Sequence, residues 1–165
     1  MSYPDALDRE RSLNLCCFRT GDDMFGIDTF AVREVLGRCE LHEVPLAPKF
    51  VAGVLAYRGE VLLAVSFRAL LGLPPHAEAS SAVVLRDTET GELFALLLDE
   101  LLEVVKVRDN TWEPNPATLD ECCSLLFSGV YRTPGSPLVR LEPERVQPSW
   151  LTRHLDSWMR IGEQR

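Results

Sequence analysis

Two apolar runs joined by a three-residue tip constrain the fold of this chain more than any other feature. The runs are residues 50–57 and 61–67, and Arg58-Gly59-Glu60 lies between them. A glycine between two runs of β-forming residues is typical of a β-hairpin. Nearly every position in both runs is apolar, so we expect both faces of the hairpin to be buried. The arginine at the tip favours a binding surface over a catalytic centre.

Short strand candidates, separated by turn residues, follow one another along the rest of the chain. We expect strands at 13–19, 24–27, 32–36, 82–86, 93–98, 101–107, 127–132 and 138–141. Helical patterns are few, and we expect them at 67–71, 119–126 and 148–161, with a loop at 110–118. Many short strands with few helices indicate a β-sandwich or barrel. A parallel α/β fold is disfavoured, because it needs long crossover connections.

Size and charge limit the domain organisation and the partners. A chain of 165 residues suits one domain, or two small barrels that share a core. We expect a domain at 12–147, a flexible N-terminus at 1–11 and a helical extension at 148–165. A net charge of −8 should repel nucleic acid and anionic lipid. No apolar run is long enough to span a membrane, and the charged N-terminus lacks a signal-peptide core, so we expect a cytoplasmic protein.

The sequence carries little catalytic chemistry. Its five cysteines form no CxxC motif and are odd in number, which favours reduced thiols over disulfides or a zinc site. The three histidines lack metal-ligand spacing, and no phosphate-binding motif is present. We therefore expect no metal, no cofactor and no small-molecule substrate. A nucleophile at Cys122 or Cys123 is the enzymatic alternative, although nothing in the local sequence activates either thiol.

Several motifs in order give the chain a family resemblance. Residues 21–37 read GDDMFGIDTFAVREVLG, and Val44-Pro45, Pro48, Gly53-Val54 and Tyr57-Arg58-Gly59 follow at matching spacings. This pattern resembles the CheW-type chemotaxis adaptors. Weaker matches at 97–104 and 127–130 extend the resemblance over about residues 13–146.

The resemblance implies a mostly β fold of two packed five-stranded SH3-like barrels, with short helices, a C-terminal helix and a hydrophobic groove between the barrels. It implies a scaffold rather than an enzyme. The implied partners are the regulatory domain of a CheA-type histidine kinase and the cytoplasmic signalling tip of a methyl-accepting chemoreceptor. The protein would then be cytoplasmic and recruited to membrane receptor arrays.

Carried over by position, the family pattern identifies candidate partner-binding residues. It pairs Glu34 with Arg58, and we expect this bridge to pin the central hairpin to the segment 32–36. Loss of one partner would be strongly destabilising if the bridge is buried and nearly neutral if it is exposed. The remaining candidates near the partner-binding side are Val32, Val35, Val44, Val54 and Gly59.

The chain departs from the family pattern just after the hairpin tip. Leu63 replaces a proline, Ser66 an aspartate and Phe67 a leucine, while Ala56 replaces an asparagine before the arginine. Leucine and phenylalanine still pack, so the fold should survive. The identity of the partners stays open, and the alternative is a CheW-like module that serves another complex, such as a motility or developmental pathway, without kinase stimulation.

Overall fold

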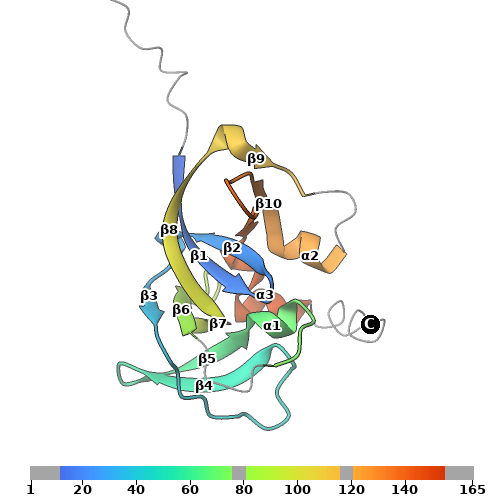
Figure 1. The fold of residues 1–165 in the computed structure, drawn as a ribbon. Coiled ribbons are helices and arrows are strands. Elements are labelled where there is room, and N and C mark those ends of the chain that lie inside the picture. The colour runs from blue at the N-terminus through green and yellow to red at the C-terminus, as the bar shows by residue number, and fades with distance from the viewer. Residues whose placement is uncertain (1–11, 76–80, 116–120, 155–165) are drawn as a thin grey trace, which may run out of the picture.

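The computed structural model describes residues 12–75, 81–115 and 121–154, with the backbone alone for 121–123. Their strands form two curved sheets that pack together, one above the other in Figure 1. We call the two sheets barrel A and barrel B. The mostly β, SH3-like fold with few short helices confirms the predicted fold class.

Barrel A is formed by the first two strands and the last four strands of the described chain. Its strands lie in the order β8-β1-β2-β11-β10-β9, and only the β2–β11 pair is parallel. The strands are β1 (Ser12–Thr20), β2 (Asp23–Asp28), β8 (Glu100–Arg108), β9 (Trp112–Glu113), β10 (Phe127–Tyr131) and β11 (Leu138–Leu141).

Barrel B comes from the middle of the chain and contains the predicted hairpin. Its strands lie in the order β3-β6-β7-β5-β4, so β3 and β4 are the two end strands. The strands are β3 (Glu34–Leu36), β4 (Val51–Tyr57), β5 (Glu60–Ser66), β6 (Ser81–Arg86) and β7 (Leu93–Leu98). A one-residue irregularity in β4 separates Val51 from Gly53, and such a bulge bends the strand.

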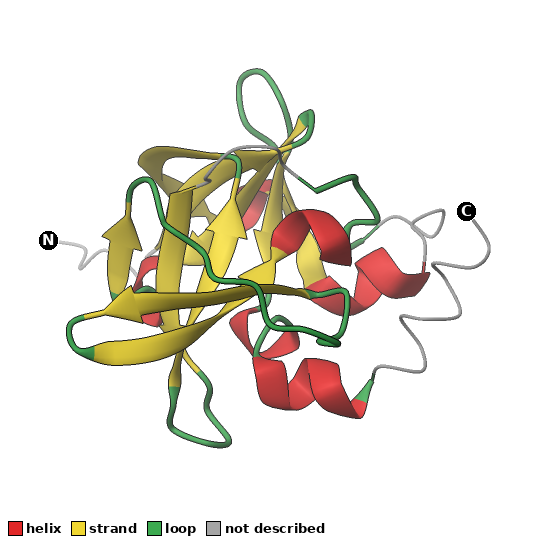
Figure 2. Ribbon diagram, turned by 90° about the horizontal axis from the view of Figure 1, so that it is seen from below, coloured by secondary structure: helices red, strands yellow, loops and turns green. Residues whose placement is uncertain are grey.

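Helical segments are short and mark the connections. They are η2 (Thr29–Ala31), α1 (Phe67–Leu70), η3 (Asp109–Thr111), α2 (Glu121–Leu126), η4 (Pro143–Arg145) and α3 (Pro148–Arg153). Figure 2 shows the α-helices to one side of the strands. Ser66 starts α1 because its hydroxyl accepts a hydrogen bond from the Ala69 amide. No helix among the described residues is long and apolar enough to cross a membrane.

An apolar core between the barrels holds them together. At its centre, Phe25 contacts Phe18 and Phe127 from barrel A and Phe67 from the start of α1, with ring centroids 4.9–5.7 Å apart. Each barrel also has a smaller core of its own. The central core continues to α3, where Trp150 and Leu151 are buried.

A mostly buried ion pair that the sequence did not predict lies at the junction of the barrels. The Arg68 guanidinium on α1 lies 2.7 Å from the carboxylate of Asp99, just before β8. The same carboxylate oxygen accepts a hydrogen bond from the Gly21 amide in the β1–β2 turn. Asp99 therefore links α1 of barrel B to a turn of barrel A.

Several local expectations were wrong in detail. The hairpin is not buried on both faces, because Ala56 and Val61 are exposed near its tip, at the edge of barrel B. By contrast, the extended segment predicted at 32–36 is present, because Val32 has an extended backbone, the Arg33 amide donates to the Val84 carbonyl of β6, and β3 follows. The predicted loop at 110–118 begins with η3 and β9, because Trp112 and Glu113 pair with β10. Of the helix predicted at 148–161, the described part is α3 and its cap at His154.

Two predictions lie outside the described residues. These are the flexible N-terminus at 1–11 and the end of the helical extension, which includes Trp158.

Candidate functional site

Glu34, Tyr57 and Arg58 join the two end strands of barrel B. Glu34 begins β3, Tyr57 ends β4, and Arg58 lies in the turn that follows. One carboxylate oxygen of Glu34 accepts a hydrogen bond from the Tyr57 hydroxyl, and the other lies 3.0 Å from Nη2 of Arg58. Because β3 and β4 are not neighbours in the sheet, these side chains close the barrel where backbone pairing does not. We call the three residues the edge clasp.

The turn geometry places Arg58 at the clasp. Arg58 has a φ of +47° and Gly59 a φ of +79°, so both central residues of the turn are left-handed, as in type I′ hairpins. Glycine adopts this conformation without strain, which gives Gly59 a structural role. Arginine rarely adopts it, and here its guanidinium bonds Glu34 and lies 5.4 Å from the centre of the Tyr57 ring.

The ion pair of the edge clasp is solvent-exposed. The Arg58 side chain is 73% exposed and that of Glu34 is 32% exposed. The sequence left open whether this bridge is buried or exposed. It is exposed, so it contributes little to stability. A charge pair that adds little stability and faces solvent is free to interact with a partner.

Tyr57 is the member of the clasp that sequence reasoning missed. Its hydrogen bond is the main cause that lowers the pKa of Glu34; partial burial opposes this, and Arg58 adds to it. The same hydrogen bond raises the pKa of the Tyr57 hydroxyl, because the neighbouring carboxylate disfavours the phenolate. The sequence feature that could have identified Tyr57 is its position next to the arginine at the hairpin tip, where its hydroxyl can reach the same carboxylate.

Replacing Tyr57 with phenylalanine is expected to raise the pKa of Glu34 toward its ordinary value. The substitution removes the strongest interaction that favours the carboxylate and leaves Arg58 in place. A pH titration of the Glu34 carboxyl by NMR should show a higher midpoint in the variant. Since a lowered carboxyl pKa stabilises the fold only above that pKa, the pH dependence of stability should weaken in the acid range where Glu34 titrates. An unchanged midpoint would contradict this role of Tyr57.

A cleft of about 980 Å³ opens beside the edge clasp, with walls from both barrels. Barrel B contributes η2, the start of β3, the hairpin tip and the end of β6, and the segment around η4 contributes the opposite wall. Charged side chains of both signs surround it, namely Arg33, Arg58, Arg86, Glu34, Glu142 and Glu144. This mixed rim suits a protein partner with charges of both signs more than a single anion.

The predicted residues fall into three places rather than one. Val32 lines the cleft together with Glu34 and Arg58. Val35 lies on the opposite face of β3. Val44, which is exposed, and Val54, which is half-buried, lie near the outer edge of β4, where His42 bonds Val54 in both directions.

Gly53 allows this close approach at the β4 edge. A Cβ atom at Gly53 would lie 2.5 Å from the carbonyl oxygen of His42, and its φ is +150°. Only glycine fits here without displacing the backbone.

Exposed valines of the two barrels lie on either side of the junction between them, and we call the apolar surface there the groove. Val35 of β3 is paired with Val83, and Val104 of β8 is paired with Cys16. Directly paired residues share a face of their sheet. Since Val83 and Cys16 belong to the central core, both exposed valines lie on the faces that the barrels turn toward each other. They are 49% and 60% exposed, respectively.

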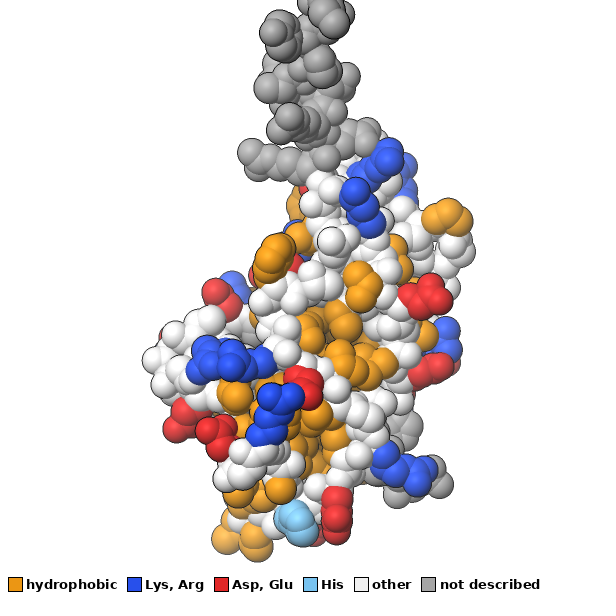
Figure 3. All heavy atoms as spheres, turned by 90° about the vertical axis from the view of Figure 1, so that its left-hand side faces the viewer, with side chains coloured by type: hydrophobic (Ala, Val, Ile, Leu, Met, Phe, Trp, Pro, Cys, Tyr) orange, Lys and Arg blue, Asp and Glu red, His pale blue; other side chains and the backbone are white. Residues whose placement is uncertain are grey.

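The groove is visible from the side of the molecule that carries β3 and β8. Figure 3 shows apolar side chains gathered at the centre of this face, with charged side chains around them. Val104 is exposed although it lies in an apolar stretch of its strand. An exposed apolar patch with a charged border is typical of a protein-binding surface.

The described residues offer little for catalysis or metal binding. Cys16, Cys17 and Cys39 are buried free thiols, and burial raises the pKa of each, that of Cys17 to about 11 with a further contribution from Cys16. Such thiols are not nucleophilic at neutral pH. Within the described part of the chain, no three His, Cys, Asp or Glu side chains are arranged to hold a metal ion. The side chains of Cys122 and Cys123 lie outside it.

Comparisons with known proteins give consistent matches. The family model of the CheW-like domain matches residues 14–149. The chemotaxis protein CheW of Rhizobium meliloti (strain 1021) is 30% identical over 135 residues, which cover 82% of this chain and 87% of the relative. CheW of Helicobacter pylori (strain ATCC 700392 / 26695) is 25% identical over 120 residues, covering 73% of each chain.

A solved structure has the same fold. The scaffolding protein TtCheW from Thermoanaerobacter tengcongensis superposes with a TM-score of 0.72 at 19% identity, over 82% of this chain and 92% of that one.

Proposed function

Because this chain belongs to the CheW family, we propose that it couples methyl-accepting receptors to a CheA-type histidine kinase as a non-enzymatic chemosensory scaffold. The proteins of this family are adaptors and scaffolds rather than enzymes. Holding two partners together raises their effective concentration and lets the conformation of one bias the activity of the other.

The observation that carries the proposal is the apolar groove between the barrels. Val35 and Val104 expose valine side chains on opposing rims, next to a charged surface that includes the edge clasp. A groove of this kind suits the apolar face of an amphipathic helix. The receptor tip is the helical member of the two partners, so we assign the groove to the receptor.

The remaining candidate residues extend the partner-binding surface. We propose that Glu34, Arg58, Val32 and the Gly59 turn act at the cleft, and that Val44 and Val54 act at the β4 edge. With partners of this kind, the protein works in the cytoplasm and is recruited to membrane receptor arrays.

Binding measurements with the two partner fragments test the proposal. We expect the chain to bind the regulatory domain of a CheA-type kinase and a receptor signalling fragment, each in isothermal titration calorimetry. Adding all three components should raise kinase autophosphorylation above that of the kinase alone. Binding to neither fragment would overturn the proposal.

A second candidate function is a CheW-like module in another complex, such as one for motility or development. The departures from the family pattern at Leu63 and Ser66, in β5, favour keeping it. Capture of a non-kinase partner without kinase stimulation would support this function over the first.

Replacing Arg58 with alanine is expected to weaken binding to the receptor or the kinase and leave the fold nearly unchanged. The ion pair with Glu34 is exposed, so the melting temperature should fall by less than about 4 °C. The affinity should fall because the guanidinium at the cleft is lost. Titration calorimetry and thermal melting measure the two effects.

Arg19 provides the matched control for Arg58. It is an exposed arginine of barrel A in an ion pair of 3.2 Å with Glu100. Arg68 is unsuitable because it is mostly buried and paired with Asp99. Equal losses of affinity for Arg19→Ala and Arg58→Ala would argue against a specific role of the clasp.

A further inference from the structure

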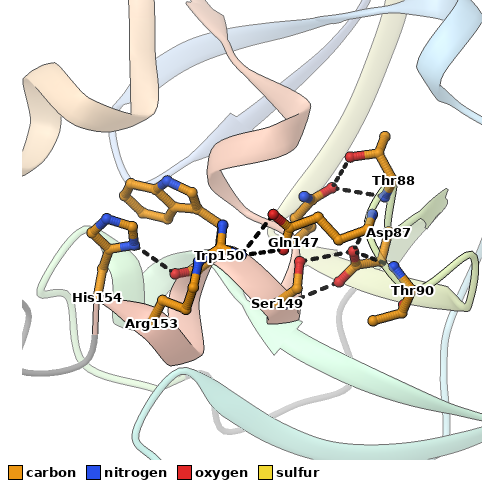
Figure 4. Close-up of polar contacts among 9 residues, drawn as sticks. Asp87, Thr88, Thr90, Gln147, Ser149, Trp150, Arg153 and His154 are labelled. Carbon is orange, nitrogen blue, oxygen red and sulfur yellow. Dashed lines mark hydrogen bonds and ion pairs between the residues drawn. The ribbon is translucent and has the colours of Figure 1, made fainter.

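A polar cluster ties the two barrels together at the end of the cleft. Asp87 and Thr88 belong to the turn between β6 and β7 of barrel B. Gln147 and Ser149 lie at the start of α3, which follows the last strand of barrel A. Figure 4 shows the side chains of these residues pointing toward one another from the two segments. We call the four residues the barrel clasp.

Asp87 is the centre of the barrel clasp. It is 2% exposed, and its carboxylate accepts hydrogen bonds from both segments. Within its own turn, Oδ1 accepts from the amides of Glu89 and Thr90 at 3.0 and 3.3 Å. From α3, Oδ2 accepts from the Ser149 amide at 2.9 Å, and Oδ1 from the Ser149 hydroxyl at 2.8 Å.

The charged form of Asp87 is favoured in spite of its burial. Burial alone would raise the pKa of this carboxyl, but the hydrogen bonds from Ser149, Glu89 and Thr90 outweigh it and the pKa is lowered. Hydrogen bonds to an ionised acceptor are stronger than neutral ones.

Gln147 connects the barrel clasp to the cleft. Its side-chain oxygen accepts from the amide of Thr88 at 3.0 Å and from the Thr88 hydroxyl at 3.2 Å. Both residues line the cleft, as do Pro143 and Glu144 of η4. Since η4 is separated from α3 by only Val146 and Gln147, a displacement of α3 moves this wall of the cleft.

Other contacts also hold α3 on the body, and one of them, an ion pair of 2.6 Å between Arg153 and Glu89, joins α3 to the same turn as Asp87. Trp150 is buried, with His154 stacked on its ring at 4.0 Å and the Arg145 guanidinium 5.1 Å from the ring centre. His154 is therefore half-buried. The Arg153–Glu89 pair is exposed, whereas Asp87 is buried, so we expect the bonds of Asp87 to contribute more to the placement of α3.

We infer that Asp87 is a positioning residue of the cleft, which acts through Ser149 and α3 to set the separation between the η4 wall and the wall formed by β3 and the hairpin tip. Its effect on partner binding rests on the proposed function, in which the cleft contacts a partner. Its effect on the separation of the two walls is independent of the proposed function.

A distance measurement across the cleft tests the inference without a partner. Spin labels on non-natural amino acids, placed at Arg33 on one wall and Glu144 on the other, avoid the native cysteines. In Asp87→Asn, an amide nitrogen replaces one of the two accepting oxygens and faces a donor of Ser149, so the distance distribution should become wider than in the parent chain. Asp22→Asn, which changes an exposed carboxylate in the β1–β2 turn of barrel A, should leave the distribution unchanged. Equal distributions for Asp87→Asn and the parent would overturn the inference.

Affinity measurements add a readout that a purely structural role would not change. At a temperature where circular dichroism shows each variant fully folded, Asp87→Asn should bind the receptor fragment or the kinase regulatory domain about tenfold more weakly. Unchanged affinity for both, with a wider distance distribution, would overturn the link to binding. If the parent chain binds neither fragment, the proposed function fails while the distance measurement still decides the role of Asp87.

Ser149→Ala serves if Asp87→Asn does not fold. It removes one of the hydrogen bonds from α3 to Asp87 and keeps the backbone one. The distance distribution should widen less than in Asp87→Asn, and no widening at all would count against the inference.

Discussion

Replacing Phe25 with alanine is expected to lower the free energy of unfolding by about 3–5 kcal/mol, the range for large-to-small changes at well-packed aromatic sites. Phe25 is 3% exposed and contacts three other phenylalanine rings. Two of these rings come from barrel A and one from the start of α1, so the cavity would open where the barrels meet. Because the core there is shared, one urea transition should report the loss for both barrels.

Phe30 provides the control of identical chemistry. It lies in η2 and is 97% exposed, so Phe30→Ala should change stability by less than about 0.5 kcal/mol. Urea denaturation followed by tryptophan fluorescence and by circular dichroism measures both variants. A loss below about 1 kcal/mol for Phe25→Ala would contradict a shared aromatic core. Two separate transitions would contradict the shared core as well.

Local signals in the sequence were sufficient to predict most strands. The central hairpin, the turn at Arg58-Gly59 and the β6–β7 pair follow from apolar runs and glycine positions a few residues apart. The shortest strand was missed because two residues, Trp112 and Glu113, carry no detectable alternation. Burial was harder to predict. Val61 and Val104 have the same local pattern as buried valines, and only the course of the other strands leaves them exposed.

The polar sites depend on residues that are far apart in the chain. The pairing of Glu34 with Arg58 was predicted from a family resemblance, since nothing in the spacing of two residues 24 positions apart requires it. Asp87 and Ser149 are 62 positions apart, and neither has a local signature beyond a turn and a helix start. The sequence indicates Tyr57 only as an apolar residue of a strand. Its hydroxyl bonds Glu34 because β3 and β4, the two end strands of barrel B, meet there.

The two clasps differ in burial and so in what they contribute. Asp87 is buried and fully engaged, so the barrel clasp restricts how the barrels are placed. The edge clasp is exposed and its ion pair adds little stability. A buried network that sets geometry and an exposed charge pair beside an apolar groove are the two features that a scaffold needs, because it must hold a fixed shape and still present surfaces to partners.

The exposure of Val104 makes it the most informative position for a substitution in the groove. A carboxylate at this position meets solvent in the free protein, so Val104→Asp should fold with a change in stability of less than about 1 kcal/mol. In a complex, the same carboxylate would be buried against the apolar face of a partner helix without a counter-charge. The cost of an unpaired buried charge is several kcal/mol.

We therefore expect Val104→Asp to weaken binding of the receptor signalling fragment by about 100-fold, which corresponds to about 2.8 kcal/mol. Glu103→Lys is the control, because Glu103 is the exposed neighbour of Val104 on β8 and this change alters charge while it leaves the valine in place. Titration calorimetry at two salt concentrations separates the effects, since long-range charge effects are screened by salt and burial of a charge is not. A gain of affinity for Glu103→Lys that matches or exceeds the loss for Val104→Asp would show that net charge, rather than the apolar rim, governs binding. An unchanged affinity of Val104→Asp would place the receptor outside the groove.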